Sequence, residues 1–62
     1  MMERFILEVE GPNLADVQEI ELPRPPVEGD LIETRFGTLP VARYEVMPAE
    51  SLYVGKVVCR LH

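Results

Sequence analysis

Apolar and polar residues alternate in two runs near the start of the chain, the pattern of β-strands with one buried face. The first run covers residues 4–10 and the second covers residues 17–22. The residues predicted to face the core are Phe5, Leu7 and Val9 in the first run and Gln18, Ile20 and Leu22 in the second. In the first run only Ile6 breaks the pattern, because it stands on the polar side.

The two runs are predicted to pair as an antiparallel hairpin. Residues 11–13 supply the turn, and residues 14–16 are expected to form a loop or a single helical turn. The predicted cross-strand pairs are Glu10 with Val17, Glu8 with Glu19, Leu7 with Ile20, and Phe5 with Leu22. A slip by one residue would turn the second run's apolar residues to the wrong face, so the alternation favours this register.

Three further strands are predicted at residues 30–36, 39–47 and 53–61. The prolines in residues 23–27 cannot donate ladder hydrogen bonds, so this segment is expected to cross between strands or to form an edge that resists pairing. Gly29 can take a positive φ in the tight turn that precedes the third strand.

Five short strands without helical periodicity predict an all-β fold, a small five-stranded, antiparallel SH3-like barrel, with an OB-like barrel as the alternative. Residues 1–62 are expected to form this single domain. Val41 and Tyr44 are three positions apart, so both can face inward only if the fourth strand carries a bulge.

A proline-rich segment that ends in a Gly-Asp turn carries a resemblance to known proteins. The stretch from Leu22 to Ile32, LPRPPVEGDLI, resembles the entry into a strand in small, uncharacterised SH3-like barrel proteins of bacteria and phages. Gly37 and Val41 continue the likeness, which covers residues 22–61. The resemblance implies a barrel fold and no particular activity.

Charge and cysteine content limit the environments in which the chain is expected to act. Eleven acidic and six basic residues give a net charge of −5, the sign that phosphate backbones and anionic membranes repel. Neither direct nucleic-acid binding nor membrane binding is expected. The start of the chain lacks the pattern of a signal peptide, and the single Cys59 cannot form an internal disulfide, so a cytoplasmic location is expected.

No residue pattern predicts catalysis, and no cofactor is expected. Cys59 is in phase with Leu61 on the last predicted strand, which indicates a buried, inert thiol. One cysteine and one terminal histidine, His62, do not make a zinc site. Phe36 and Tyr44 are expected in the core, which leaves Tyr53 as the only free ring.

The outward face of the predicted hairpin is the candidate partner-binding surface. Its residues are Ile6, Glu8, Glu10, Val17, Glu19 and Glu21. The simpler interpretation is a solvated face whose acids aid solubility and protect sheet edges from aggregation. The functional interpretation is a landing surface for a basic partner, to which the two apolar residues add contact area. A third alternative is that Lys56, Arg60 or Arg43 from a neighbouring strand neutralises the acids.

The favoured hypothesis is a non-enzymatic interaction module that binds a basic protein. Such a partner can be a basic nucleic-acid-binding surface, which the domain would occupy as a charge mimic with a regulatory or inhibitory outcome. The alternative is a self-associating structural or assembly subunit of bacterial or phage origin, a homodimer closed by outward apolar residues. Among those residues, Leu31 and Val58 are expected to cover the open ends of the barrel.

Overall fold

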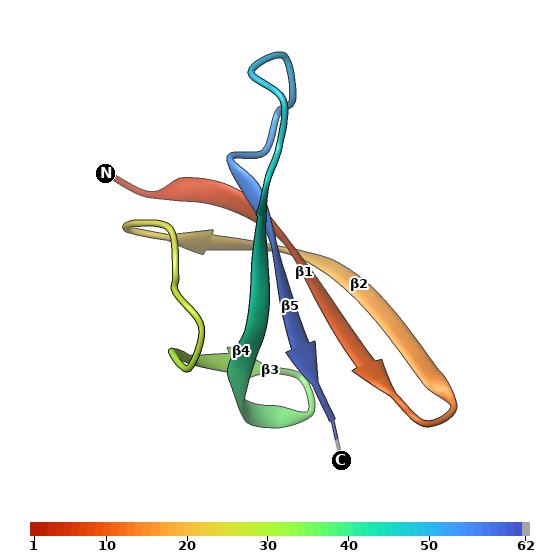
Figure 1. Cartoon of the computed structure of the whole chain (residues 1–62). Coiled ribbons are helices and arrows are strands. Elements are labelled where there is room, and N and C mark those ends of the chain that lie inside the picture. Colours follow the sequence, from red (N-terminus) through yellow and green to blue (C-terminus); the bar gives the residue numbers. More distant parts are fainter. Residues whose placement is uncertain (62) are drawn as a thin grey trace.

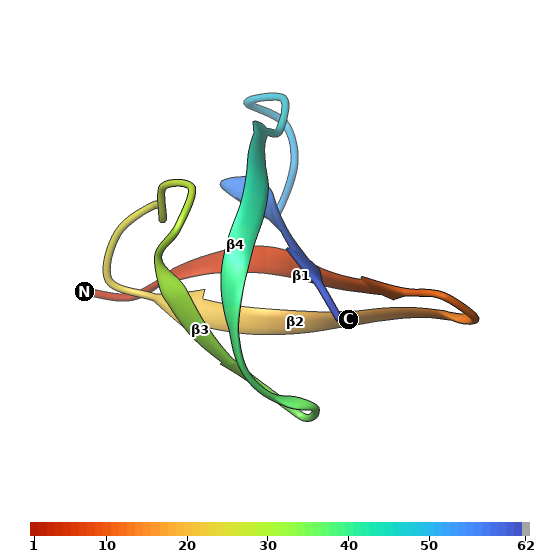
Figure 2. The ribbon, with the colours of Figure 1, turned by 60° about the horizontal axis from the view of Figure 1, so that its bottom comes forward.

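A computed structural model describes residues 1–61, and in this part of the chain five β-strands follow one another without a helix. The strands are β1 (Glu3–Gly11), β2 (Leu14–Leu22), β3 (Leu31–Thr34), β4 (Gly37–Val46) and β5 (Gly55–Arg60). They form a mixed sheet in the order β2-β1-β5-β4-β3, which curls into a half-barrel (Figure 1 and Figure 2). The predictions of an all-β fold and of five strands are confirmed.

β1 and β2 form an antiparallel hairpin with a two-residue turn, Pro12-Asn13. The observed pairs include Phe5 with Ile20, Leu7 with Gln18, Glu8 with Val17, and Glu10 with Ala15. None of the four predicted pairs forms, and the predicted register is wrong by two residues. The reason is that β2 begins already at Leu14, so that the expected loop at residues 14–16 is strand. A shift of two residues preserves the side-chain faces, so the residues predicted to face inward do so, and Asp16, opposite Val9, joins them.

β5 lies between β1 and β4 and runs parallel to β1, which corrects the prediction of a purely antiparallel barrel. Gly55 is paired both with Phe5 near the start of β1 and with Val46 at the end of β4. The short connection at residues 47–54 therefore returns the chain at the end of the sheet where β1 begins. Residues 57–59 are fully buried, as in a central strand that is covered on both faces.

The predicted bulge in β4 is present. The register against β5 shifts between Val41 and Arg43, so Ala42 is the additional residue. Beyond the bulge Tyr44 faces inward, and its ring meets that of Phe5 edge to face, with 6.1 Å between the centroids and 62° between the planes. The bulge thus places a second aromatic ring over the core.

The core lies on the inner face of the curled sheet. Its buried cluster consists of Phe5, Leu7, Val9, Ile32, Val41, Val57 and Cys59. Gly55 is buried next to Tyr44, and a β-carbon at this position would overlap the Tyr44 ring. The close approach of ring and backbone therefore requires glycine.

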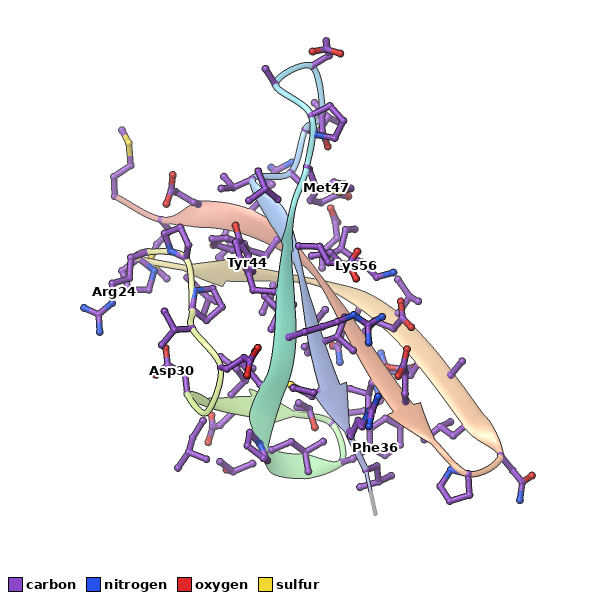
Figure 3. The ribbon with its side chains drawn as sticks, in the orientation of Figure 1. Arg24, Asp30, Phe36, Tyr44, Met47 and Lys56 are labelled. Atoms are coloured by element: carbon purple, nitrogen blue, oxygen red, sulfur yellow. The ribbon has the colours of Figure 1, made fainter. Side chains whose placement is uncertain are left out.

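Phe36, which was predicted in the core, is 36 % exposed at the turn between β3 and β4 (Figure 3). The strand ends earlier than predicted because the Thr34 hydroxyl accepts a hydrogen bond from the Phe36 N–H at 3.0 Å and donates one to the Gly37 carbonyl at 2.8 Å. These bonds form a tight turn that holds Phe36 outside the sheet.

Residues 23–30 arch from the end of β2 to β3 without forming a strand, as the prolines predicted (Figure 1). Gly29 has a φ of +92°, and its N–H donates a hydrogen bond to the Val41 carbonyl at 3.0 Å. The Val41 N–H in turn donates to the Asp30 carbonyl at 2.8 Å. The turn is therefore fixed to β4, and β3 begins directly after it.

Candidate functional site

The six residues predicted to contact a partner share the outer face of the β1–β2 hairpin. Their exposure differs between the two strands. Those on β1, namely Ile6, Glu8 and Glu10, are half-buried, whereas those on β2, namely Val17, Glu19 and Glu21, are exposed. The exposed fraction of Val17 is 62 %. The two strands therefore offer different surfaces to a partner.

Glu8 on β1 forms an ion pair with Lys56 of β5, with 2.6 Å between Oε1 and Nζ. Only 18 % of the Glu8 side chain and 29 % of the Lys56 side chain are exposed. The hydrogen bond from the Lys56 ammonium lowers the pKa of Glu8, and the carboxylate raises the pKa of Lys56. In Figure 3, Lys56 and the inward-facing Tyr44 lie on opposite sides of β4.

Glu10 lies between Arg60 of the adjacent strand β5 and Arg43 of β4, the next strand beyond it. Its carboxylate is 3.8 Å from Arg43 Nη2 and 4.0 Å from Arg60 Nε. Arg43 also donates a hydrogen bond of 2.7 Å from Nε to Glu45, which lowers the pKa of Glu45. Val58 lies among these charged residues, and it is fully buried in the middle of the sheet, not at an open end as predicted. The alternative that neighbouring bases neutralise the acids is thus confirmed for Glu8 and Glu10.

Glu19 on β2 accepts a hydrogen bond from the Tyr53 hydroxyl. The prediction that Tyr53 is a free ring is therefore wrong. Tyr53 belongs to the β4–β5 connection, so its ring must reach across β1 beside Ile6, which stands directly opposite Glu19. The hydrogen bond to the carboxylate raises the pKa of Tyr53. This contact holds Glu19 in place and leaves its negative charge uncompensated.

β2 and β3 are the two edges of the sheet, and no strand pairing joins them in the described part of the chain. An open groove of about 400 Å³ lies between them. It is lined by Ile20, Glu21 and Leu22 of β2 and by Leu31, Ile32 and Glu33 of β3. Leu31 is 70 % exposed, in agreement with its predicted outward position, but it lies between the two edges of the sheet and not at an open end of a barrel. The groove itself was not predicted, because it depends on the order of the strands.

The groove continues past the end of β2 under the proline-rich segment. Pro23 and Pro26 line this continuation, which has a volume of about 350 Å³. Arg24 also lines it, and its side chain extends outward (Figure 3). At the opposite end of β2, Arg35 Nη1 lies 3.5 Å from Asp16 Oδ1. Cations therefore stand at both ends of the opening.

Between these two ends the carboxylates have no cation. Within residues 1–61, Glu19, Glu21 and Glu33 have no basic group within 4.0 Å. Arg4 of β1 lies opposite Glu21 of β2, but the two side chains do not form an ion pair. The uncompensated acidity of this face is therefore concentrated on β2 and around the opening, and not on β1.

Metal-ligating side chains and the cysteine thiol are two features of the described part of the chain that bear on chemistry. Residues 1–61 contain no group of three or more side chains able to hold a metal ion. Cys59 is fully buried, and burial raises the pKa of its thiol, which disfavours the reactive thiolate. His62 lies outside the described residues. Among residues 1–61 there is no helix with the length and apolar character needed to cross a membrane.

Fold and surface together define a small all-β half-barrel domain with an acidic, unpaired strand at the edge of its sheet. Comparison with protein-family models, with curated proteins and with solved structures gave no match. The surface chemistry alone therefore bears on what this chain binds.

Proposed function

We propose that this chain is a non-enzymatic protein-interaction domain that binds a basic partner protein through β2 and the opening beside it. The supporting observation is the distribution of ion pairs. Glu8 and Glu10 are bound to cations, whereas Glu19, Glu21 and Glu33 have none within 4.0 Å among residues 1–61. Carboxylates without a partner keep their field available to steer and to bind a positively charged protein.

Apolar side chains beside these acids supply the contact area that charge alone does not provide. Val17 is 62 % exposed on the outer face of β2, and Leu31 is 70 % exposed at the groove. Interfaces combine such apolar contacts with complementary charge around them. Of the six residues predicted from the sequence, those on β2 are therefore proposed to contact the partner, and those on β1 to support the sheet.

A basic surface that normally binds nucleic acid is one kind of partner that suits this charge. The domain would cover that surface and displace the polyanion, and its effect would be inhibitory. Binding of this kind weakens as salt rises, because exposed charges are screened beyond a Debye length of about 8 Å at physiological ionic strength.

Charge reversal at matched positions tests the proposal. Glu21→Lys changes β2, and Glu50→Lys makes the same change in net charge on the exposed β4–β5 connection. With decalysine as a defined basic probe, titration calorimetry at low salt should show a loss of affinity of about tenfold or more for Glu21→Lys and about twofold or less for Glu50→Lys. Equal losses for the two variants, or no binding by the wild type, would contradict the proposal.

A further inference from the structure

We propose further that the partner binds as an extended segment that adds a strand to the free edge of β2. This inference rests on the proposed function, since it specifies the form of the basic partner. β2 spans nine residues and is paired with β1 on one side only in the described sheet. The backbone N–H and C=O groups of alternate residues on its other side therefore have no strand partner. Edges of this kind accept extended peptides through main-chain hydrogen bonds.

The two faces of β2 determine the side chains that the added strand must carry. Glu19 and Glu21 project from the outer face, whereas Ile20 and Leu22 project from the inner face. Side chains of neighbouring strands align face by face, so the partner places basic residues beside the glutamates and aliphatic residues beside Ile20 and Leu22. The inward aliphatic residues then enter the groove of about 400 Å³ between β2 and β3. The inferred ligand is a strand in which basic and aliphatic residues alternate.

The ends of the free edge limit the length of the ligand. Asp16 is paired with Arg35 at one end. At the other end Pro23 has no N–H to donate, and the positive charge of Arg24 follows directly. The available stretch is therefore residues 17–22, which extends over about 20 Å at roughly 3.3 Å per residue. A segment of about six residues matches this length.

The charge of the two free edges disfavours a second copy of the chain as the occupant. β2 carries Glu19 and Glu21, and β3 carries Glu33. Pairing either edge with the same or the other edge of a second copy would bring carboxylates together on one face, and like charges in adjacent strands are destabilising. The same acids that keep copies of this domain apart therefore select a basic strand.

Backbone-modified peptides test this inference on the intact domain. The probe is the capped hexapeptide Lys-Val-Lys-Val-Lys-Val. One control has the same composition in blocks, Lys-Lys-Lys-Val-Val-Val. Two further peptides keep the alternating sequence and carry N-methyl groups on alternate amides, either at the three lysines or at the three valines. Affinity is measured by titration calorimetry, and sedimentation records the oligomeric state of the domain with and without peptide.

The alternating peptide should bind about tenfold or more tightly than the block peptide, because only alternation satisfies both faces of β2. One of the two N-methylated peptides should lose about tenfold or more in affinity and the other much less, because only alternate amides of an added strand face β2.

Equal affinities for all four peptides would overturn the added strand and would leave the proposed binding of a basic partner in place. No binding of any peptide, together with no binding of decalysine, would overturn both proposals. A stable dimer of the domain that the alternating peptide does not dissociate would show that a second copy occupies the edge, and would equally overturn the inference.

Discussion

On the outer face of the sheet, the carboxylates of Glu8 and Glu10 on β1 form ion pairs, whereas those of Glu19 and Glu21 on β2 have no basic group within 4.0 Å among residues 1–61. Glu8 is 2.6 Å from Lys56, and Glu10 lies between Arg43 and Arg60. Glu19, one strand further out, has only a tyrosine hydroxyl as its partner. Residues of the same type in the same alternating pattern thus have different environments on adjacent strands.

The difference follows from the position of each strand in the sheet. β1 lies between β2 and β5, so its outward acids stand beside the bases of β5. β2 is an edge strand, and it has only β1 as a neighbour. Acids on the inner strand therefore contribute to the ion-pair network over Val58, whereas acids on the edge remain available to a partner.

The largest contrast is expected in the core. Leu7 on β1 is fully buried, whereas Leu22 at the end of β2 is half-buried beside the groove. Leu7→Ala should lower the free energy of unfolding by about 2–5 kcal/mol, and Leu22→Ala by less than about 2 kcal/mol, because the open site leaves a smaller cavity. Urea denaturation of the two variants measures the difference. Equal losses would show that the edge is as tightly packed as the centre.

A smaller loss of stability is expected where the backbone of β5 approaches Tyr44. Gly55→Ala should lower the free energy of unfolding by about 1–3 kcal/mol, because the new methyl group forces the ring away. Gly11→Ala is the matched control at the end of β1, where the added β-carbon would have only ordinary contacts, the nearest at 3.5 Å. Thermal unfolding compares the two variants. A Gly55→Ala variant as stable as Gly11→Ala would contradict the packing of Tyr44 against this strand.

The ion pair between Glu8 and Lys56 predicts a pH-dependent contribution to stability. The folded-state pKa of Glu8 is lowered from the ordinary value of 4.5, so its contribution to stability is present above pH 4.5 and is lost as the pH falls through the lower folded pKa. Glu8→Gln should therefore have a lower urea midpoint than the wild type at neutral pH, and the gap should narrow as the pH falls below 4.5. Glu21→Gln is the matched control, because it removes a carboxylate that forms no ion pair within residues 1–61. A constant gap for Glu8→Gln would contradict the role of the ion pair.

The smallest effect concerns Tyr53. The hydrogen bond to Glu19 raises the pKa of Tyr53 from 10.0, and burial raises that of Tyr44. Glu19→Gln should shift the ultraviolet titration of one tyrosine to lower pH and leave the other in place, because the negative partner is removed. Glu33→Gln serves as the control, and it should leave both titrations unchanged. An unaltered curve for Glu19→Gln would mean that Tyr53 does not bind this carboxylate in solution.

The faces of the strands were predictable from the sequence, whereas the register and the strand order were not. Alternation is a local property, so the inward residues of β1 and β2 followed directly from the pattern. The start of β2 was missed because Asp16, which is bound to Arg35, puts a charged residue on its inner face. The parallel position of β5 has no local signal except its continuous apolar run at residues 57–59.

The residues of the candidate surface were predicted from the sequence, but the environment of each residue was not. All six predicted residues share one face, but the sequence does not indicate which strand forms the edge of the sheet. The ion pairs of Glu8 and Glu10 and the groove beside β2 both depend on contacts between segments far apart in the chain. Only the outward position of Leu31 indicated an apolar surface at the opening.

Amide hydrogen exchange along β2 tests the central claim most directly. In the free domain, alternate amides between residues 17 and 22 should exchange rapidly, while the amides directed towards β1 are protected. Addition of the alternating lysine-valine peptide should slow the rapid set, with little change in β4 and β5. Uniform protection of β2 in the free domain, or rapid exchange that the bound peptide leaves unchanged, would contradict an open edge that accepts a strand.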